Sequence, residues 1–150
     1  MRERIKDDLK TAMLAKDKER TAALRLIAAA IKDRDILARG NGAEAASASE
    51  LIDLLAKMVK QRQESARIYE ENARPELAAI ERGEIAVIED YLPRQLDEAG
   101  ISAAIAAAIA ATGAAGIKDM GKVMGELKAH HAGQMDFAKA GAAVKAALTG

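Results

Sequence analysis

Two glycines, Gly121 and Gly125, lie four positions apart in a segment that otherwise has the apolar spacing of a helix. A glycine inside a helix costs about 1 kcal/mol relative to alanine, so a stable helix is expected to avoid both. Residues four apart share one helix face, and Ala129 continues the row, so one strip carries almost no side chain. Lys122 and Lys128 flank that strip. A bare strip between two ammonium groups suits the close approach of another backbone, either that of a packed helix or that of a phosphodiester chain.

The composition favours closely packed helices. Aromatic residues make up 2% of the 150 residues, so the core has to be built from Leu, Ile, Met and Ala. The formal net charge is zero, which excludes a basic field strong enough to attract nucleic acid over a long range. The sequence contains no cysteine, which excludes disulfides, thiolate metal ligands and a cysteine nucleophile.

No segment has the pattern of a membrane span. Residues 1–8 lack the apolar run of a signal peptide. The longest uncharged stretch, residues 101–117, is shorter than the ~20 residues that a spanning helix needs. We therefore expect a soluble cytoplasmic protein with no membrane partner.

Apolar residues recur at helical spacing along almost the whole chain, which predicts an all-α fold. Ser47 and Glu50 have the spacing of a capping box at the start of a long helix. Pro75 suits the first turn of the next helix, where its missing N–H is not needed. Four helices are predicted before Pro93. The second runs from after Asp17 to about Ala38, and the third ends at about Asn72. Their apolar stripes are, in chain order, Ile5, Leu9 and Met13; Leu24, Ile27, Ala28 and Ile31; Leu51, Leu55, Met58 and Tyr69; and Leu77, Ile80, Ile88 and Tyr91.

The charged residues Arg62, Glu81 and Glu84 fall inside these apolar stripes, and Arg62 and Glu84 can be matched to each other. If the third and fourth helices form an antiparallel hairpin that turns near residue 73, Arg62 and Glu84 are both eleven residues from the turn. They are then expected at the same level, as an interhelical ion pair. Such a pair fixes the register of the hairpin more reliably than it stabilises the fold.

Pro93 marks the predicted domain boundary, because the residue before a proline is biased away from the helical conformation. We expect an N-terminal helical domain over residues 1–93 and a small three-helix domain over residues 94–150. In the second domain Asp97 and Asp136 are the predicted caps of the first and last helices.

Four segments in this order and spacing resemble the GatB/YqeY family. They are Leu24 to Lys32, Lys60 to Ser65, Tyr91 to Leu96, and Met120 to Met124. The resemblance covers essentially the whole chain. It implies an elongated N-terminal helical hairpin domain followed by the small three-helix domain. In that family the module also forms the tail of the B subunit of the glutamine-dependent aminoacyl-tRNA amidotransferase, where it contacts tRNA.

The resemblance also implies carbon–nitrogen ligase activity with glutamine as the amido donor. We attribute that activity to the amidotransferase in which the module occurs, and not to the module itself. Releasing ammonia from glutamine needs an activated nucleophile, and activating a carboxyl group with ATP needs a phosphate loop; the sequence shows neither pattern. His130 and His131 are adjacent, so they point about 100° apart on a helix and do not suit one metal ion. We expect no catalytic residue, no metal site and no cofactor.

The sequence and the resemblance together predict a tRNA-binding accessory module. An adaptor that docks on an aminoacyl-tRNA synthetase or an amidotransferase is the alternative, and the glycine strip has the further alternative of close helix packing inside the small domain. The residues expected at the RNA surface are Lys118, Gly121, Lys122, Gly125, Lys128, Lys139 and Lys145.

Overall fold

The computed structural model describes residues 1–149, which form seven α-helices and one short 3₁₀ helix, with no strand in that range. The predicted all-α class is confirmed. The chain divides into two compact units, an N-terminal unit from Met1 to Leu92 and a C-terminal unit that begins at Pro93. The elements are α1 (Arg2–Leu14), α2 (Lys18–Gly40), α3 (Ala48–Glu71), α4 (Pro75–Glu89), α5 (Glu98–Thr112), η1 (Ile117–Asp119), α6 (Met120–His131) and α7 (Phe137–Thr149).

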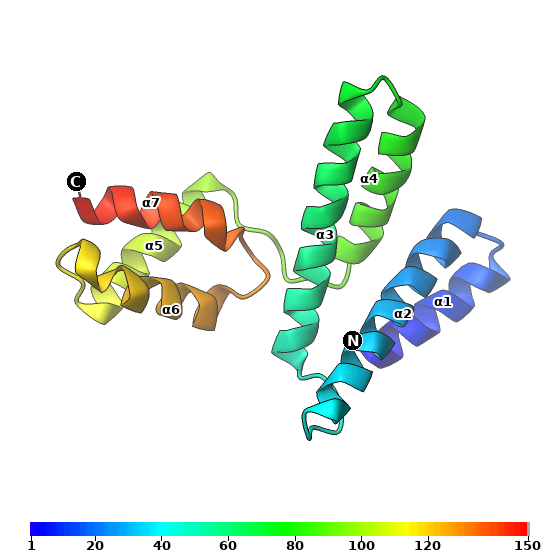
Figure 1. The fold of residues 1–150 in the computed structure, drawn as a ribbon, viewed down its shortest axis with the longest axis horizontal. Coiled ribbons are helices and arrows are strands. Elements are labelled where there is room, and N and C mark those ends of the chain that lie inside the picture. The colour runs from blue at the N-terminus through cyan, green and yellow to red at the C-terminus, as the bar shows by residue number, and fades with distance from the viewer. Residues whose placement is uncertain (150) are drawn as a thin grey trace. The chain divides into compact units, whose positions relative to one another are not determined.

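The N-terminal unit consists of two helical hairpins, α1 with α2 and α3 with α4 (Figure 1). The α2 helix joins them, because it also packs on α4 and α3. Aliphatic side chains supply the shared core, as the near absence of aromatics requires. Its fully buried members are Leu24, Ile27, Leu51, Leu55 and Ile88.

Side-chain caps define where two of these helices begin. Asp17 accepts a hydrogen bond from the Arg20 amide at 3.1 Å at the start of α2, and Ser47 accepts one from the Glu50 amide at 3.2 Å at the start of α3. The second half of the predicted capping box differs, since the Glu50 carboxylate forms an ion pair at 3.0 Å with Arg34 of α2. That pair joins two helices instead of closing a local turn.

Two residues expected in buried stripes are exposed. Met13, near the end of α1, is 50% exposed, and Ile80 of α4 is 58% exposed. The buried positions of α4 are Ala78, Ile85 and Ile88. Around a regular helix Ile80 lies about 160° from Ala78 and about 140° from Ile85, and only Ile88 is nearer, at about 80°, so Ile80 falls outside the centre of the buried face.

The predicted interhelical ion pair between Arg62 and Glu84 is present in the α3–α4 hairpin. The Arg62 Nε donates to the Glu84 Oε2 at 2.8 Å, and the Arg62 Nη1 donates to the Met58 carbonyl at 3.3 Å. The Arg62 side chain is 16% exposed and that of Glu84 is 22% exposed. The pair is therefore largely withdrawn from water, in a geometry in which it can fix register.

The C-terminal unit has a separate small core between α5, α6 and α7, whose most buried members are Val123, Leu127 and Val144. Asp97 caps α5 by accepting from the Gly100 amide at 2.7 Å. Gly113 ends α5 in the left-handed conformation, with φ of 66°, which glycine adopts without steric cost.

No single helix in the described part of the chain is long and apolar enough to cross a membrane. Two segments, Glu98–Thr112 and Ile117–His131, reach that length and apolar composition only when they are taken together, and the chain bends by 94° between them.

Candidate functional site

The glycine strip of α6 faces open space. A Cβ atom added at Gly121 or at Gly125 meets no other atom within 4 Å, and Ala129 is exposed. The alternative that these glycines allow a neighbouring helix to pack closely is therefore wrong. The buried face of α6 is formed by Val123 and Leu127 on the other side of the helix.

The lysines expected around this strip are exposed, and they come from three elements. Lys122 lies 4.0 Å from the Asp119 carboxylate, whose pKa is lowered chiefly by a hydrogen bond from the Ala115 amide. Lys128 flanks the strip on its other side. The remaining three are Lys118 in η1 and Lys139 and Lys145 in α7, the last two six residues apart and hence on different sides of that helix.

The two histidines at the end of α6 bind different partners. His130 Nε2 lies 3.0 Å from Glu126 Oε1, and His131 Nδ1 lies 2.9 Å from Gln134 Oε1. Within residues 1–149 no group of three His, Cys, Asp or Glu side chains could hold a metal ion.

A different candidate site lies in the N-terminal unit, as a cleft of about 320 Å³ between α1 and α2. Its floor is apolar, with Ile5 and Leu9 from α1 and Ala28 and Ile31 from α2. The volume is at the lower end of the range of about 300–1,000 Å³ that is usual for ligand sites. The residues that surround this floor are Arg2, Lys6, Lys32, Asp35 and Arg39.

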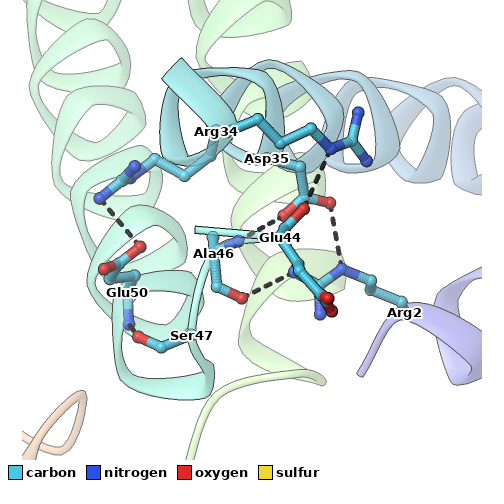
Figure 2. Close-up of polar contacts among 8 residues, drawn as sticks. Arg2, Arg34, Asp35, Glu44, Ala46, Ser47 and Glu50 are labelled. Atoms are coloured by element: carbon cyan, nitrogen blue, oxygen red, sulfur yellow. Dashed lines mark hydrogen bonds and ion pairs between the residues drawn. The ribbon is translucent and has the colours of Figure 1, made fainter. Parts of the chain in front are cut away.

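The only carboxylate of this cleft, that of Asp35, is already neutralised (Figure 2). Arg2 approaches it from α1 with an Nη2–Oδ1 distance of 2.6 Å and an Nε–Oδ2 distance of 3.1 Å. The Ala46 amide donates to Asp35 Oδ1 at 2.9 Å from the opposite side. Hydrogen bonding to Arg2, reinforced by the Ala46 amide, lowers the pKa of Asp35 to about 2.

This network fixes one end of the cleft. Arg2 Nη2 also donates to the Ala46 carbonyl at 2.8 Å, so the start of α1, the last third of α2 and the loop before α3 are joined at one point. Arg39 Nε donates to the Glu44 carbonyl at 3.0 Å and holds the same loop. Two of the four cations at the cleft are thus already engaged.

Lys6 and Lys32 are the other two cations, one on each helix of the cleft. Both are exposed, and neither forms an ion pair with a residue in the range 1–149. The cleft therefore combines an apolar floor with two uncompensated ammonium groups. Such a site suits an occupant that is apolar on one side and anionic at its margins.

This cleft was not predicted from the sequence, although one signal for it was present. Asp35 is one turn from Ile31 and two turns from Ala28, so it stands at the edge of the apolar stripe of α2. The same kind of misplaced charge led to Arg62 and Glu84. Its partner Arg2 is 33 residues away and belongs to a helix whose register against α2 could not be fixed from the sequence.

The comparison with known families agrees with the fold. A sequence model described as "Yqey-like protein" matches residues 2–148. The chain belongs to the YqeY-like family. The match spans both units, and it confirms the resemblance drawn from the four sequence segments.

Curated relatives share the name "Altered inheritance of mitochondria protein 41, mitochondrial". One from Saccharomyces cerevisiae strain YJM789 is 38% identical over 88 residues, which is 59% of this chain and 46% of the relative. One from Clavispora lusitaniae is 40% identical over 97 residues, 63% of this chain and 54% of the relative. The chain thus spans about half the length of the curated relatives that it matches.

These names contradict two expectations. The relatives are named for the inheritance of mitochondria, not for tRNA binding, for carbon–nitrogen ligation or for association with a synthetase or amidotransferase. The predicted tRNA-binding accessory function, with its adaptor alternative, is therefore wrong. The predicted cytoplasmic location is wrong as well, since the relatives are named as mitochondrial proteins.

Proposed function

We propose that this YqeY-like protein is a binding module whose α1–α2 cleft receives an acidic amphipathic helix of a partner protein. The observation that carries the proposal is the position of Lys6 and Lys32, which stand unpaired on facing helices above an apolar floor. An amphipathic helix places apolar side chains into such a groove and leaves its polar flanks at the rim.

The electrostatics of the cleft favour acidic flanks. Asp35 is engaged by Arg2 and the Ala46 amide, so it does not present a free negative charge to an incoming carboxylate. Lys6 and Lys32 are both exposed to solvent, and neither ammonium group is paired with a residue in the range 1–149. A glutamate on either flank of the bound helix gains an ion pair without displacing an existing one.

The shape of the cleft favours a helix over a compact ligand. The groove between two antiparallel helices extends along both axes, and a third helix can lie in it by the packing of side-chain ridges into grooves. The hollow of about 320 Å³ then receives apolar anchor side chains of that helix, while the remaining contacts stay at the surface.

A charge-swap experiment tests this proposal. The probe is a synthetic peptide of about 18 residues, long enough to form a helix alone, with leucines on one face and glutamates on both flanks. Its affinity is measured by fluorescence anisotropy at low and high salt, beside a peptide in which lysines replace the glutamates. We expect the glutamate peptide to bind more tightly, and Lys6→Glu/Lys32→Glu to weaken it about tenfold or more while it strengthens the lysine peptide.

The matched control is Lys57→Glu, which reverses the charge of an exposed lysine on α3, outside the cleft. It should leave both affinities within about twofold, because exposed charges more than about 10 Å apart are largely screened at moderate salt. Equal binding of the two peptides, or a charge-reversed cleft that keeps its preference for glutamate, would show that Lys6 and Lys32 do not select the occupant.

A further inference from the structure

The tip of the α1–α2 hairpin exposes two neighbouring large apolar side chains. Leu14 is 77% exposed and Met13 is 50% exposed, and Leu14 has the largest exposed fraction of any large apolar side chain in the described range. Single exposed apolar residues are common on soluble proteins. This pair is unusual because it projects at the end of a hairpin and is surrounded by lysines.

Four cations lie around this pair. Lys10 precedes it on α1, Lys16 and Lys18 follow it in the turn and the first position of α2, and Arg25 lies two turns further along α2. The three lysines form no ion pair with any residue among 1–149. Arg25 makes only a long contact of 4.0 Å with the Met13 sulfur. All four charges are thus available to an outside ligand.

Three other charged residues lie near this tip, and two of them are engaged by groups within the protein. Asp17 caps α2 through the Arg20 amide, and the Arg20 guanidinium turns to the Asp90 carboxylate at 3.3 Å. Glu19 is the one further acid in the first turn of α2. The tip therefore carries an excess of positive charge although the whole chain is neutral.

A second hollow, of about 400 Å³, opens between these cations. It is lined by the cations Lys16, Lys18 and Arg25, by Met13, Thr21 and Ala22, and by Asp17, whose carboxylate accepts the hydrogen bond from the Arg20 amide. Three cations and a hydroxyl around one hollow form a set of donors suited to a phosphate group. Met13 borders the same hollow, so a phosphate held there has an apolar neighbour.

We propose that this tip docks on the surface of an anionic phospholipid bilayer. The hollow holds a lipid phosphate, while Leu14 and Met13 enter the boundary between headgroups and acyl chains. Amphipathic surfaces bind membranes by this combination of buried apolar area and attraction to anionic lipids, and juxtaposed lysines strengthen it. The protruding shape of Leu14 favours a bilayer over a nucleic acid, whose backbone offers no apolar layer to receive it.

This proposal departs from the expectation of no membrane partner, which concerned spanning segments. A peripheral contact at a hairpin tip needs no spanning helix. It is also independent of the α1–α2 cleft, since it depends on Met13, Leu14, Lys16, Lys18 and Arg25 and the cleft depends on other side chains.

The absence of tryptophan from the sequence allows a direct test. The full-length Leu14→Trp variant carries a single tryptophan at the tip, and its emission is recorded with vesicles of phosphatidylcholine alone and with vesicles that contain about 30% phosphatidylglycerol. We expect a blue shift with the anionic vesicles, lost at high salt, and little or none with the neutral ones. The control is Ile80→Trp, at an exposed position of α4, whose emission should not move.

A second pair of variants separates charge from apolar insertion. Vesicle co-sedimentation should fall about tenfold for Lys16→Glu/Lys18→Glu, and by a similar factor for Leu14→Glu, while Lys57→Glu should bind as the unaltered protein does. Equal shifts of the Leu14 and Ile80 tryptophans would overturn the proposal. So would a tip that binds inorganic phosphate, detected by calorimetry, but does not sediment with anionic vesicles.

Discussion

The Tyr91 hydroxyl donates a hydrogen bond to the Asp8 carboxylate and so ties the segment after α4 to the middle of α1. The Tyr91 ring is buried, at 6% exposed, and the Arg4 guanidinium lies over it at 4.7 Å from the ring centroid. Arg4 also donates to the Asp90 carbonyl at 2.8 Å. One aromatic residue therefore links the C-terminal end of the N-terminal unit to its first helix.

Removal of the hydroxyl tests this closure. Tyr91→Phe keeps the ring, its burial and its contact with Arg4, but leaves the Asp8 carboxylate without its donor. We expect a loss of about 0.5–1.5 kcal/mol in the free energy of unfolding, the usual net value of one hydrogen bond. Urea denaturation measures it. Tyr69→Phe, at a half-buried position of α3, is the matched control and should change stability by less.

The same residue predicts a pH dependence. Burial, with help from the hydrogen bond to Asp8, raises the pKa of Tyr91 to about 12, from an ordinary value of 10.0. The folded protein therefore keeps the phenol neutral where the unfolded chain ionises it, so this contribution is complete below pH 10 and declines between about pH 10 and 12. In Tyr91→Phe the decline over that range should be shallower. An identical alkaline profile would mean that Tyr91 ionises as freely in the folded protein as in the unfolded chain.

Asp35 predicts the opposite trend in acid. Its folded pKa is about 2, below the ordinary value of 3.8, because Arg2 and the Ala46 amide bind the charged form. The stability it provides is fully present above pH 3.8 and is lost as the pH falls from there toward 2. Asp35→Asn should lower stability at neutral pH and flatten the acid side of the profile, measured by thermal melts. Asp33→Asn, at an exposed position of the same helix, should leave the profile unchanged.

The glycines of α6 predict a gain in stability. Because a Cβ at Gly125 meets open space and the residue is helical, Gly125→Ala should raise the free energy of unfolding of the C-terminal unit by roughly 0.5–1 kcal/mol. Gly113→Ala is the control with the opposite sign, since Gly113 has a left-handed φ of 66° that alanine adopts with strain. A lower melting temperature for Gly125→Ala would mean that the strip is covered when the protein is folded.

Local sequence signals predicted most of the fold. The spacing of Leu24, Ile27 and Ile31 and the cap at Ser47 placed helices correctly, because they depend on neighbours within a few residues. The exposure of Ile80 was not predicted, since a short apolar stripe does not show which of its edges meets the next helix. The α1–α2 cleft was missed for the same reason. Its defining contact joins Arg2 to Asp35, and only the packing of two helices decides which side chains face each other.

The Arg62–Glu84 pair gives a test of register that does not depend on function. Arg62→Ala leaves a Glu84 carboxylate that is only 22% exposed without its partner, whereas Arg62→Ala/Glu84→Ala removes both charges. We expect the single variant to be less stable than the double one, with a coupling of about 1–3 kcal/mol between the two positions in a double-mutant cycle. The control cycle uses Arg67 and Glu71, an exposed pair four residues apart on α3, whose coupling should stay near the ~0.3–0.5 kcal/mol of surface pairs. If the two cycles give the same small coupling, the Arg62–Glu84 pair does not hold the hairpin in register. The apolar contacts of Leu55 and Ile88 with their neighbours in the core would then have to fix it.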